Sequence, residues 1–175
     1  MLLFALYVAA ILIGILIVPA LLPSRYRIEK HIVIQRPVEE VMEKIGDLSN
    51  YAQWNPWQQM DPAASREITG TPFHPGHRYT WNGKKVGMGS LTINNVNSRE
   101  IHFDLEFLKP WKSHAHDNWA FEPAADGGTS VTWENTGNLP WPIARLMGPI
   151  INKNLNHQFE KGINNLKQLV ERAPA

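Results

Sequence analysis

The strongest constraint on this chain is an uncharged apolar segment at its N-terminus. Leu2 to Leu22 contain no Asp, Glu, Lys or Arg, and 14 of these 21 residues are Leu, Ile, Val or Phe. A helix of this length rises about 31 Å and matches a bilayer hydrocarbon core of about 30 Å. Apolar residues would cover every face of that helix, whereas a helix buried in a small domain needs only one apolar stripe. The sequence therefore predicts a transmembrane anchor over residues 1–23.

A cleavable signal peptide is the main alternative for this segment. Such peptides place basic residues before an apolar run of about 7 to 15 residues. No Lys or Arg precedes the run here, and Val18-Pro19-Ala20 is a poor match to a small-residue cleavage site. These features favour a retained single-pass anchor, which makes the lipid bilayer a partner of the chain.

The charges that follow the segment predict its orientation. Arg25, Arg27 and Lys30 lie just after it, and only the terminal amine lies before it. Basic residues concentrate on the cytoplasmic side of membrane spans, so we expect the C-terminal domain to be cytoplasmic. The lack of cysteine fits a reducing compartment and equally a disulfide-free periplasmic domain, so it does not discriminate.

Residues 24–175 have the usual size of one domain with a single core. The chain's net charge is +1 with both signs interspersed, which provides no basic stripe for nucleic acid. The anchor joins the domain through a short Pro-Ser-Arg step, so we expect the domain to lie close to the bilayer surface.

Hydrophobic periodicity predicts one helix-and-strand order along this domain. A strand over Tyr26–Gln35 precedes a helix over Pro37–Ile45 that Gly46 ends, and a short helix or turn covers Leu48–Trp54. Further strands are predicted over Ser65–Thr69, Arg78–Trp81, Val86–Val96, Glu100–Leu108, Ser113–Glu122 and Thr129–Thr136. The expected hairpin loops are Asn82-Gly83, Asn97-Ser98 and Asp126-Gly127-Gly128.

The apolar face of one strand and the apolar stripe of the last helix predict how these elements pack. Apolar and polar residues alternate strictly over residues 101–107, as in an antiparallel sheet with one buried face. A long C-terminal helix has an apolar stripe that would cover this sheet, formed by Ile151, Leu155, Phe159, Gly162, Leu166 and Leu169. Gly162 lowers helix propensity by about 1 kcal/mol relative to Ala, and we attribute it to a close approach of the helix to a strand.

This order of elements resembles the helix-grip domains of the SRPBCC superfamily, which are START-like and of the polyketide cyclase/dehydrase type. The resemblance spans Tyr26 to Arg172. The matching segments are residues 36–41 (RPVEEV), 54–57 (WNPW), 76–81 (GHRYTW), 86–89 (VGMG), 107–110 (FLKP), 119–123 (WAFEP) and 128–133 (GTSVTW). It implies an α+β fold in which a curved antiparallel sheet of about six to seven strands wraps round a long C-terminal helix, with two short helices after the first strand.

The resemblance also implies a cavity between sheet and helix for an apolar or amphiphilic small molecule. Seven Trp residues lie in the domain, and aromatic side chains can line such a cavity or fill a core. The predicted cavity-lining residues are Trp54, Trp57, Tyr79, Trp81, Phe103, Phe107, Trp119, Phe121, Trp133 and Phe159. Trp54 and Trp57 are the most suggestive of binding, because a Trp-Asn-Pro-Trp turn is irregular backbone.

No metal or cofactor site is predicted. His114 and His116 share one strand face, and His74 and His77 lie in a loop, but neither a HExxH helix nor a cysteine pair accompanies them. If Trp119 points inward, alternation places both strand histidines on the outer face.

No catalytic residue is predicted either. The chain has no cysteine, no Gly-x-Ser-x-Gly elbow and no phosphate-binding glycine loop. Asp104, Glu106, His116 and Glu134 could act as an acid or base, but alternation places all four on faces opposite the apolar residues of their strands.

The sequence thus favours a membrane-anchored protein that binds an apolar or amphiphilic small molecule or lipid in its cavity. One alternative is a cyclase, dehydratase or hydrolase that uses the same cavity for acid–base catalysis, and another is a non-catalytic protein-interaction module. An inward-facing acid with a shifted pKa would favour catalysis, and an all-apolar lining would favour carriage. A filled interior with a large exposed apolar patch would favour the interaction module.

The segment before the long helix predicts how a ligand enters. Trp141, Ile143, Leu146 and Met147 lie between Pro140 and Gly148-Pro149, together with one Arg. Trp and Arg suit the headgroup level of a membrane, and the aliphatic residues suit the layer below it. We predict a membrane-facing gate here, with core capping as the alternative.

Overall fold

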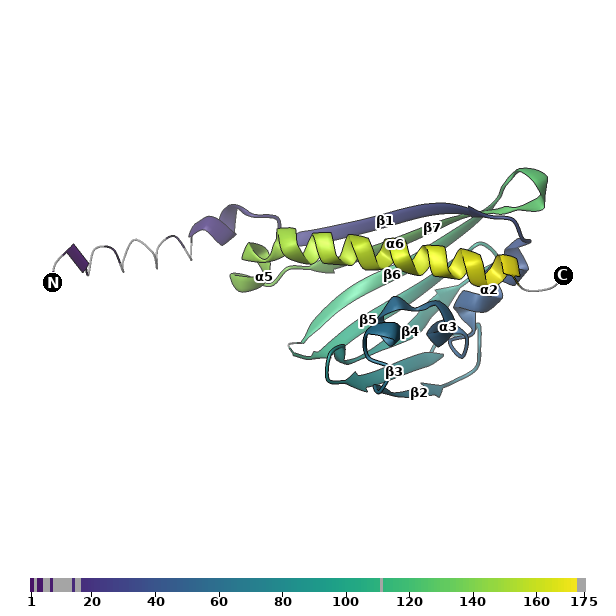
Figure 1. The fold of residues 1–175 in the computed structure, drawn as a ribbon, viewed down its shortest axis with the longest axis horizontal. Helices are drawn as coiled ribbons and strands as arrows, with labels where there is room; N and C mark the ends of the chain where they lie inside the picture. The colour runs from purple at the N-terminus through teal and green to yellow at the C-terminus, as the bar shows by residue number, and fades with distance from the viewer. Residues whose placement is uncertain (2, 5–6, 8–13, 15–16, 111, 173–175) are drawn as a thin grey trace.

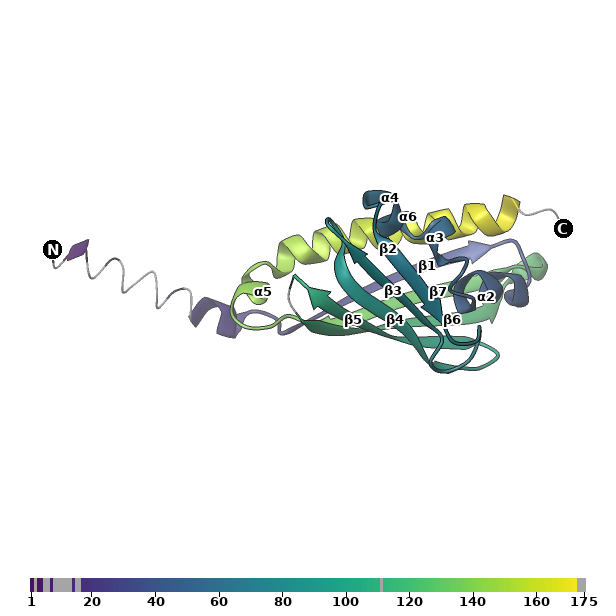
Figure 2. The same cartoon turned by 90° about the horizontal axis from the view of Figure 1, so that it is seen from below.

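One antiparallel seven-stranded sheet forms the body of the domain, with strand order β1-β7-β6-β5-β4-β3-β2. The computed structural model describes residues 1, 3–4, 7, 14, 17–110 and 112–172. Figures 1 and 2 show the sheet curving beneath the long helix α6, and the short helices α2, α3 and α4 contact α6 on that same face of the sheet. The fold is therefore the α+β helix-grip arrangement that the sequence predicts.

The observed strands agree with the predicted ones to within about two residues at their ends. Their bounds are β1 Arg25–Ile34, β2 Ser65–Thr69, β3 Arg78–Gly83, β4 Gly87–Val96, β5 Glu100–Lys109, β6 Ser113–Pro123 and β7 Thr129–Asn138. The helices are α2 Val38–Gly46, α3 Tyr51–Trp54, α4 Pro56–Met60, α5 Ile143–Leu146 and α6 Gly148–Arg172, and Ala125–Gly127 form a 3-10 turn.

The predicted hairpin loop at Asn82-Gly83 is wrong. These two residues end β3, and the turn lies at residues 84–86. The carboxylate of Asp61 accepts hydrogen bonds from the backbone N–H groups of Lys85 at 2.7 Å and Val86 at 3.4 Å. A side chain distant in sequence therefore fixes this turn, and local turn propensity does not reveal that contact.

Helix α4 was not predicted. The Trp-Asn-Pro-Trp segment begins a new helix, because the Asn55 side chain accepts a hydrogen bond from the backbone N–H of Trp57 at 2.9 Å. Pro56 occupies the first helical position, where its missing N–H has no helical partner to lose. The irregular backbone expected around Trp54 and Trp57 is thus the junction between two short helices.

Close packing of α6 on β7 explains Gly162. A Cβ atom at this position would lie 2.9 Å from the Trp133 ring and 3.2 Å from Pro56 Cδ. Only glycine permits this approach without displacing the indole. The predicted close contact of helix and strand is confirmed, and Phe159, Ile163 and Leu166 are buried on the same helix.

The predicted anchor lies largely outside the described residues, since residues 2, 5–6, 8–13 and 15–16 are among those not described. Within the part of the chain that the structure describes, no helix is both long and apolar enough to cross a bilayer. Residues 17–21 are helical and contact the domain. Arg145 Nη1 donates to the Pro19 carbonyl at 3.3 Å, and the Leu139 N–H donates to the Ser24 carbonyl at 2.8 Å.

Candidate functional site

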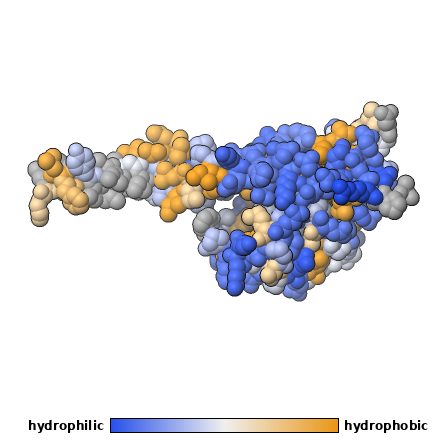
Figure 3. All heavy atoms as spheres, in the orientation of Figure 1, coloured by the Kyte–Doolittle hydropathy of each residue, from blue (hydrophilic) through white to orange (hydrophobic). Residues whose placement is uncertain are grey.

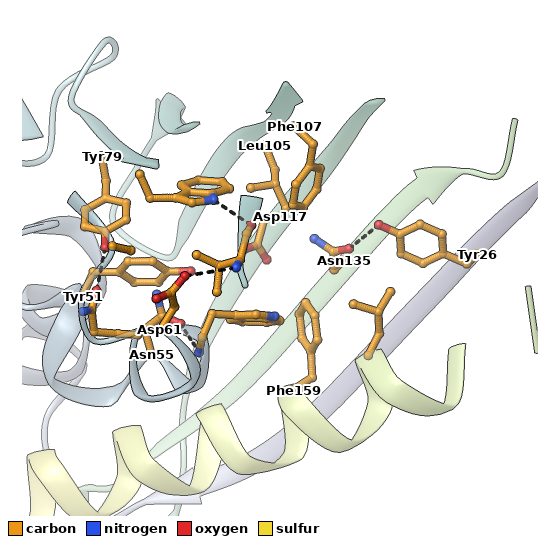
Figure 4. A pocket seen from close by; sticks show the side chains of 16 residues that line it. Tyr26, Tyr51, Asn55, Asp61, Tyr79, Leu105, Phe107, Asp117, Asn135 and Phe159 are labelled. Carbon is orange, nitrogen blue, oxygen red and sulfur yellow. Dashed lines mark hydrogen bonds between the residues drawn. The ribbon is translucent and has the colours of Figure 1, made fainter. Parts of the chain in front are cut away.

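A pocket of about 150 Å³ lies between the inner face of the sheet and helices α3, α4 and α6 (Figure 4). A cavity of this size holds a group as large as one aromatic ring. Its lining is mostly apolar and aromatic, with a few polar side chains. The lining residues are Tyr26, Tyr51, Asn55, Trp57, Gln58, Asp61, Ala64, Tyr79, Trp81, Val86, Leu105, Phe107, Asp117, Asn135, Leu155 and Phe159.

Aromatic contacts make the walls of the pocket. Trp81 is stacked on Tyr79 with ring centroids 6.3 Å apart, and its edge meets Phe107 at 5.9 Å. On the helix side, Trp57 packs edge to face against Phe159 at 5.5 Å. Because these rings contact one another, the walls are set before any ligand binds.

The structure brings half of the predicted cavity residues to the pocket. Trp57, Tyr79, Trp81, Phe107 and Phe159 lie in its lining. Whether they bind a ligand stays a prediction.

The other five predicted residues pack in the core and do not line this pocket. Trp54, Phe103, Trp119, Phe121 and Trp133 are each at most 2% exposed. Trp119 stacks on Trp133 with centroids 4.4 Å apart, and Trp54 packs edge to face against both. This aromatic cluster fills the part of the inner face that adjoins the pocket.

Three polar residues from neighbouring strands form the inner end of the pocket. Asp117 on β6 lies directly opposite Asn135 on β7, and the Tyr26 hydroxyl of β1 donates to Asn135 Oδ1 at 2.9 Å. The Asp117 carboxylate accepts a hydrogen bond from the Trp133 indole N–H. Asp117 and Asn135 are only 4% and 1% exposed, so this polar group is buried beneath an apolar lining.

Burial raises the pKa values of Asp117 and Tyr26. Burial raises the pKa of Asp117 to about 7, although the hydrogen bond from Trp133 and the nearby Asn135 amide favour the charged form. Burial, with the charge of Asp117, also raises the pKa of Tyr26 to about 12. Tyr26 is therefore a neutral donor at physiological pH, whereas Asp117 can gain or lose a proton near neutrality.

Asn135 has a buried donor without a partner. Its Nδ2 has no acceptor in hydrogen-bonding geometry among the described residues. Tyr26 binds the oxygen of the same amide, and Figure 4 shows the nitrogen on the opposite side, facing Asp117 and the cavity. A buried donor left unsatisfied costs about 1 to 3 kcal/mol, so the pocket has a position that would favour an acceptor atom.

Strand alternation in the sequence indicates that Asp117 and Asn135 face inward, although their side chains are polar. Asp117 has the same strand parity as Trp119 and Phe121, and Asn135 has that of Trp133. Position, rather than polarity, points these side chains inward.

The acid–base candidates chosen from the sequence lie on the outer face. His116 bonds to Asp104 at 3.2 Å, Arg78 approaches Glu106 at 3.4 Å, and Arg27 pairs with Glu134. They lie outside the pocket, on the face that alternation predicts.

The histidines have structural or solvent contacts. Among the described residues, no group of three His, Asp or Glu side chains could hold a metal ion. His114 and His116 are exposed, and His74 Nδ1 lies 2.8 Å from the Pro72 carbonyl. Buried His77 accepts from the Leu48 N–H at Nε2, at 3.1 Å, so its Nδ1 donates to the Thr69 carbonyl at 3.0 Å.

The segment predicted as a gate forms an exposed apolar patch, which we call the α5 patch. It consists of Trp141, Ile143, Leu146, Met147 and Ile150, which are 49%, 66%, 40%, 39% and 59% exposed. Figure 3 shows apolar side chains gathered where the N-terminal segment meets this region, beside a largely hydrophilic domain face. These side chains do not cap the core.

Comparison with known proteins gives a family and a fold. The profile of the family described as polyketide cyclase / dehydrase and lipid transport matches residues 25–171. Comparison with curated proteins gives no match.

Solved structures share the fold at low sequence identity. The Zhui aromatase/cyclase from Streptomyces sp. R1128 is 15% identical with a TM-score of 0.63, over 85% of this chain and 94% of that one. A Mesorhizobium loti protein is 13% identical (TM-score 0.64, 86% and 100% covered), and a Thermus thermophilus protein is 19% identical (0.61, 86% and 100%).

Proposed function

Because the chain belongs to the polyketide cyclase/dehydrase and lipid transport family, we propose that it is a membrane-anchored binding protein for an apolar or amphiphilic small molecule or lipid. The observation that supports this most is the pocket between the sheet and α6, with its preformed aromatic walls. Small-molecule sites are typically concave and mostly apolar, with a few polar groups that orient the ligand. A hollow interior also favours ligand binding over a module that only recruits proteins.

The proposed anchor is supported by the sequence of residues 2–22. Its apolar length fits a bilayer, and the basic residues that follow it favour a cytoplasmic side for the domain. Reporter fusions at the C-terminus test this: a fluorescent protein should be bright and alkaline phosphatase inactive. An active phosphatase fusion together with a dark fluorescent one would reverse the orientation.

The α5 patch is the proposed gate toward the bilayer. It adjoins the N-terminal segment through the bond from Arg145 to Pro19. Ile150 in the patch precedes the pocket residue Leu155 by five residues of α6, which corresponds to a rise of about 7.5 Å. A bilayer that covers the patch would therefore lie close to the helix that forms one wall of the pocket.

Ligand occupancy is the direct test of the proposed function. Native mass spectrometry of the full-length protein, released from detergent, should find a bound apolar species. Leu155→Trp should fill the pocket and reduce occupancy about tenfold, whereas Asn154→Trp, on the exposed side of α6, should not. An empty wild-type protein that also fails to bind a panel of lipids and quinones would contradict the proposal.

Asp117 supports a second candidate function, an acid–base enzyme of the cyclase or dehydratase type. A buried carboxyl group with a pKa of about 7 can both donate and accept a proton at physiological pH. Such an enzyme should exchange the C–H hydrogens next to the carbonyl of a bound aromatic ketone for deuterium in D₂O. Asp117→Asn should abolish the exchange without preventing binding, and a wild-type protein that binds the ketone without exchange would favour carriage.

A further inference from the structure

We propose that the inner end of the pocket is a hydrogen-bonding subsite for the carbonyl oxygen of a neutral, flat apolar ligand, in which Asn135 Nδ2 is the donor. This inference rests on the proposed function, because it specifies the chemistry of the ligand that the pocket binds. The polar residues at this end determine which ligands fit, and the aromatic walls supply the contact area.

The unpartnered amide nitrogen is the first support. Asn135 is 1% exposed and lines the pocket, and its Nδ2 lies near the Asp117 carboxyl group but makes no hydrogen bond with it or with any other described residue. The Tyr26 hydroxyl fixes the amide by donating to Oδ1 at 2.9 Å, which leaves Nδ2 on the cavity side. Tyr26 is therefore a positioning residue for this donor.

Asp117 determines the charge that the ligand can have. One of its oxygens accepts from the Trp133 indole, which leaves the second oxygen to carry the proton when the group is neutral. A protonated Asp117 can donate through that second oxygen, which makes it a second possible donor beside Asn135. An anionic ligand would be repelled once Asp117 ionises, and a cation would face the Asn135 donor. A neutral carbonyl can accept from Asn135, and from Asp117 while that group is protonated.

The remaining titratable groups of the pocket do not change this conclusion. Tyr26 from β1, Tyr51 from α3 and Tyr79 from β3 have raised pKa values, so all three are neutral hydroxyls. Asp61, at the end of α4, is bound by the backbone of the β3–β4 turn. Helix α6 contributes only Leu155 and Phe159 to the lining.

A matched pair of probes tests the inference on the wild-type protein. Acetophenone and isopropenylbenzene have nearly the same shape, and each has the single aromatic ring that the pocket can hold, but only the first has a carbonyl oxygen. Binding to the full-length protein in nanodiscs is measured by quenching of tryptophan fluorescence, with empty nanodiscs to correct for partition into lipid. The ketone should bind about three- to tenfold more tightly, which is the usual net effect of one buried hydrogen bond.

Variants assign the preference to Asn135. At pH 8, where most Asp117 is ionised and cannot donate, Asn135→Leu should bind both probes equally, because the Asn135 donor is lost while the volume is kept. Tyr26→Phe keeps the donor but frees the amide, so it should reduce the preference without abolishing binding of the alkene. Asn138→Leu, at the exposed end of the same strand, should retain the wild-type ratio.

The outcomes separate this inference from the proposed function. If neither probe binds, the pocket is not a ligand site and both proposals fail. If both probes bind equally to the wild-type protein, the proposed function stands and the carbonyl subsite is wrong, as would occur if a water satisfied Nδ2 in the bound state. A ketone preference that persists at pH 8 in folded Asn135→Leu would also overturn the assignment. If Asn135→Leu does not fold, the loss of ketone preference in Tyr26→Phe is the test instead.

Discussion

The inner face of the sheet has a filled region and a hollow region. They differ in the side chains at neighbouring inward-facing positions of β6 and β7. In the filled region, β6 contributes Trp119 and β7 contributes Trp133, and these two rings stack. Two residues away on the same strands and the same face, Asp117 and Asn135 replace the indoles, and the interior is hollow. The filled core thus gives way to the pocket where two aromatic side chains give way to two smaller polar ones.

The two regions also have different roles: the filled region stabilises the fold, and the hollow region provides the proposed binding site. The filled region stabilises the fold through buried aromatic area and close packing against Gly162. The hollow region buries a carboxyl group and an unpaired amide, both of which destabilise the folded state. Binding sites commonly trade stability for function in this way.

The largest expected effect is on the filled region. Trp119→Ala removes a 2% exposed indole, and we expect the free energy of unfolding to fall by about 3 to 5 kcal/mol. Trp81→Ala, in the half-buried pocket wall, should lower the free energy of unfolding by less than half of that amount. Thermal or denaturant unfolding of the full-length protein in detergent measures both losses. Equal losses would mean that the two regions do not differ in packing.

The second prediction concerns Asp117 and its pH dependence. Its folded pKa of about 7 exceeds its usual 3.8, so the folded state binds the proton more tightly than the unfolded state does. The stability that Asp117 contributes is fully present below about pH 4 and is lost as the pH rises through 7. The total loss in the free energy of unfolding is on the order of 4 kcal/mol.

Removing this charge should therefore stabilise the protein at high pH. Asp117→Asn should raise the free energy of unfolding by about 2 to 4 kcal/mol at pH 8 and by under about 1 kcal/mol at pH 4. Asp104→Asn, exposed on the outer face, is the matched control. A gain that is the same at both pH values would show that Asp117 does not ionise in this range.

A smaller effect is expected on ligand binding in the hollow region. The affinity for acetophenone should fall several-fold between pH 6 and pH 8, because ionised Asp117 repels the carbonyl oxygen and no longer donates to it. The alkene probe should bind equally at both pH values. A parallel loss for both probes would indicate a change in the fold rather than in the subsite.

The smallest change in stability is expected at the α5 patch, which belongs to neither region. Trp141→Ser with Leu146→Ser should change the free energy of unfolding by under about 0.5 kcal/mol, because both side chains are exposed. Exchange of ligand with liposomes should nevertheless slow several-fold with the anchor intact. Unchanged exchange kinetics in the folded double variant would remove the gate from the proposal.

The sequence predicted the fold better than the site. Strict alternation located the strands and their inward faces, and Gly162 correctly indicated where α6 approaches the sheet. Alternation cannot distinguish an aromatic residue in the core from one in a pocket wall, since Trp119 and Trp81 both point inward. That distinction depends on how closely the helices pack over each residue.

The polar end of the pocket was missed for a different reason. Asp117 was not among the acid–base candidates chosen from the sequence, although it has the same strand parity as Trp119. The turn after β3 and its bond to Asp61 depend on contacts between residues far apart in the chain. Such contacts leave no local pattern in the sequence.

The pairing of the first strand with the last has a consequence during synthesis. Tyr26 and its hydrogen-bond partner Asn135 are separated by 109 positions, so β1 leaves the ribosome about 5 to 20 s before β7 at usual translation rates. Through that interval β1 is an unpaired strand. Arg25, Arg27, Glu29 and His31 project from one face of it, and charges on a strand discourage pairing with the wrong partner. The same side chains that lie on the outer face of the finished sheet can therefore keep the nascent chain from aggregating until its partner strand arrives.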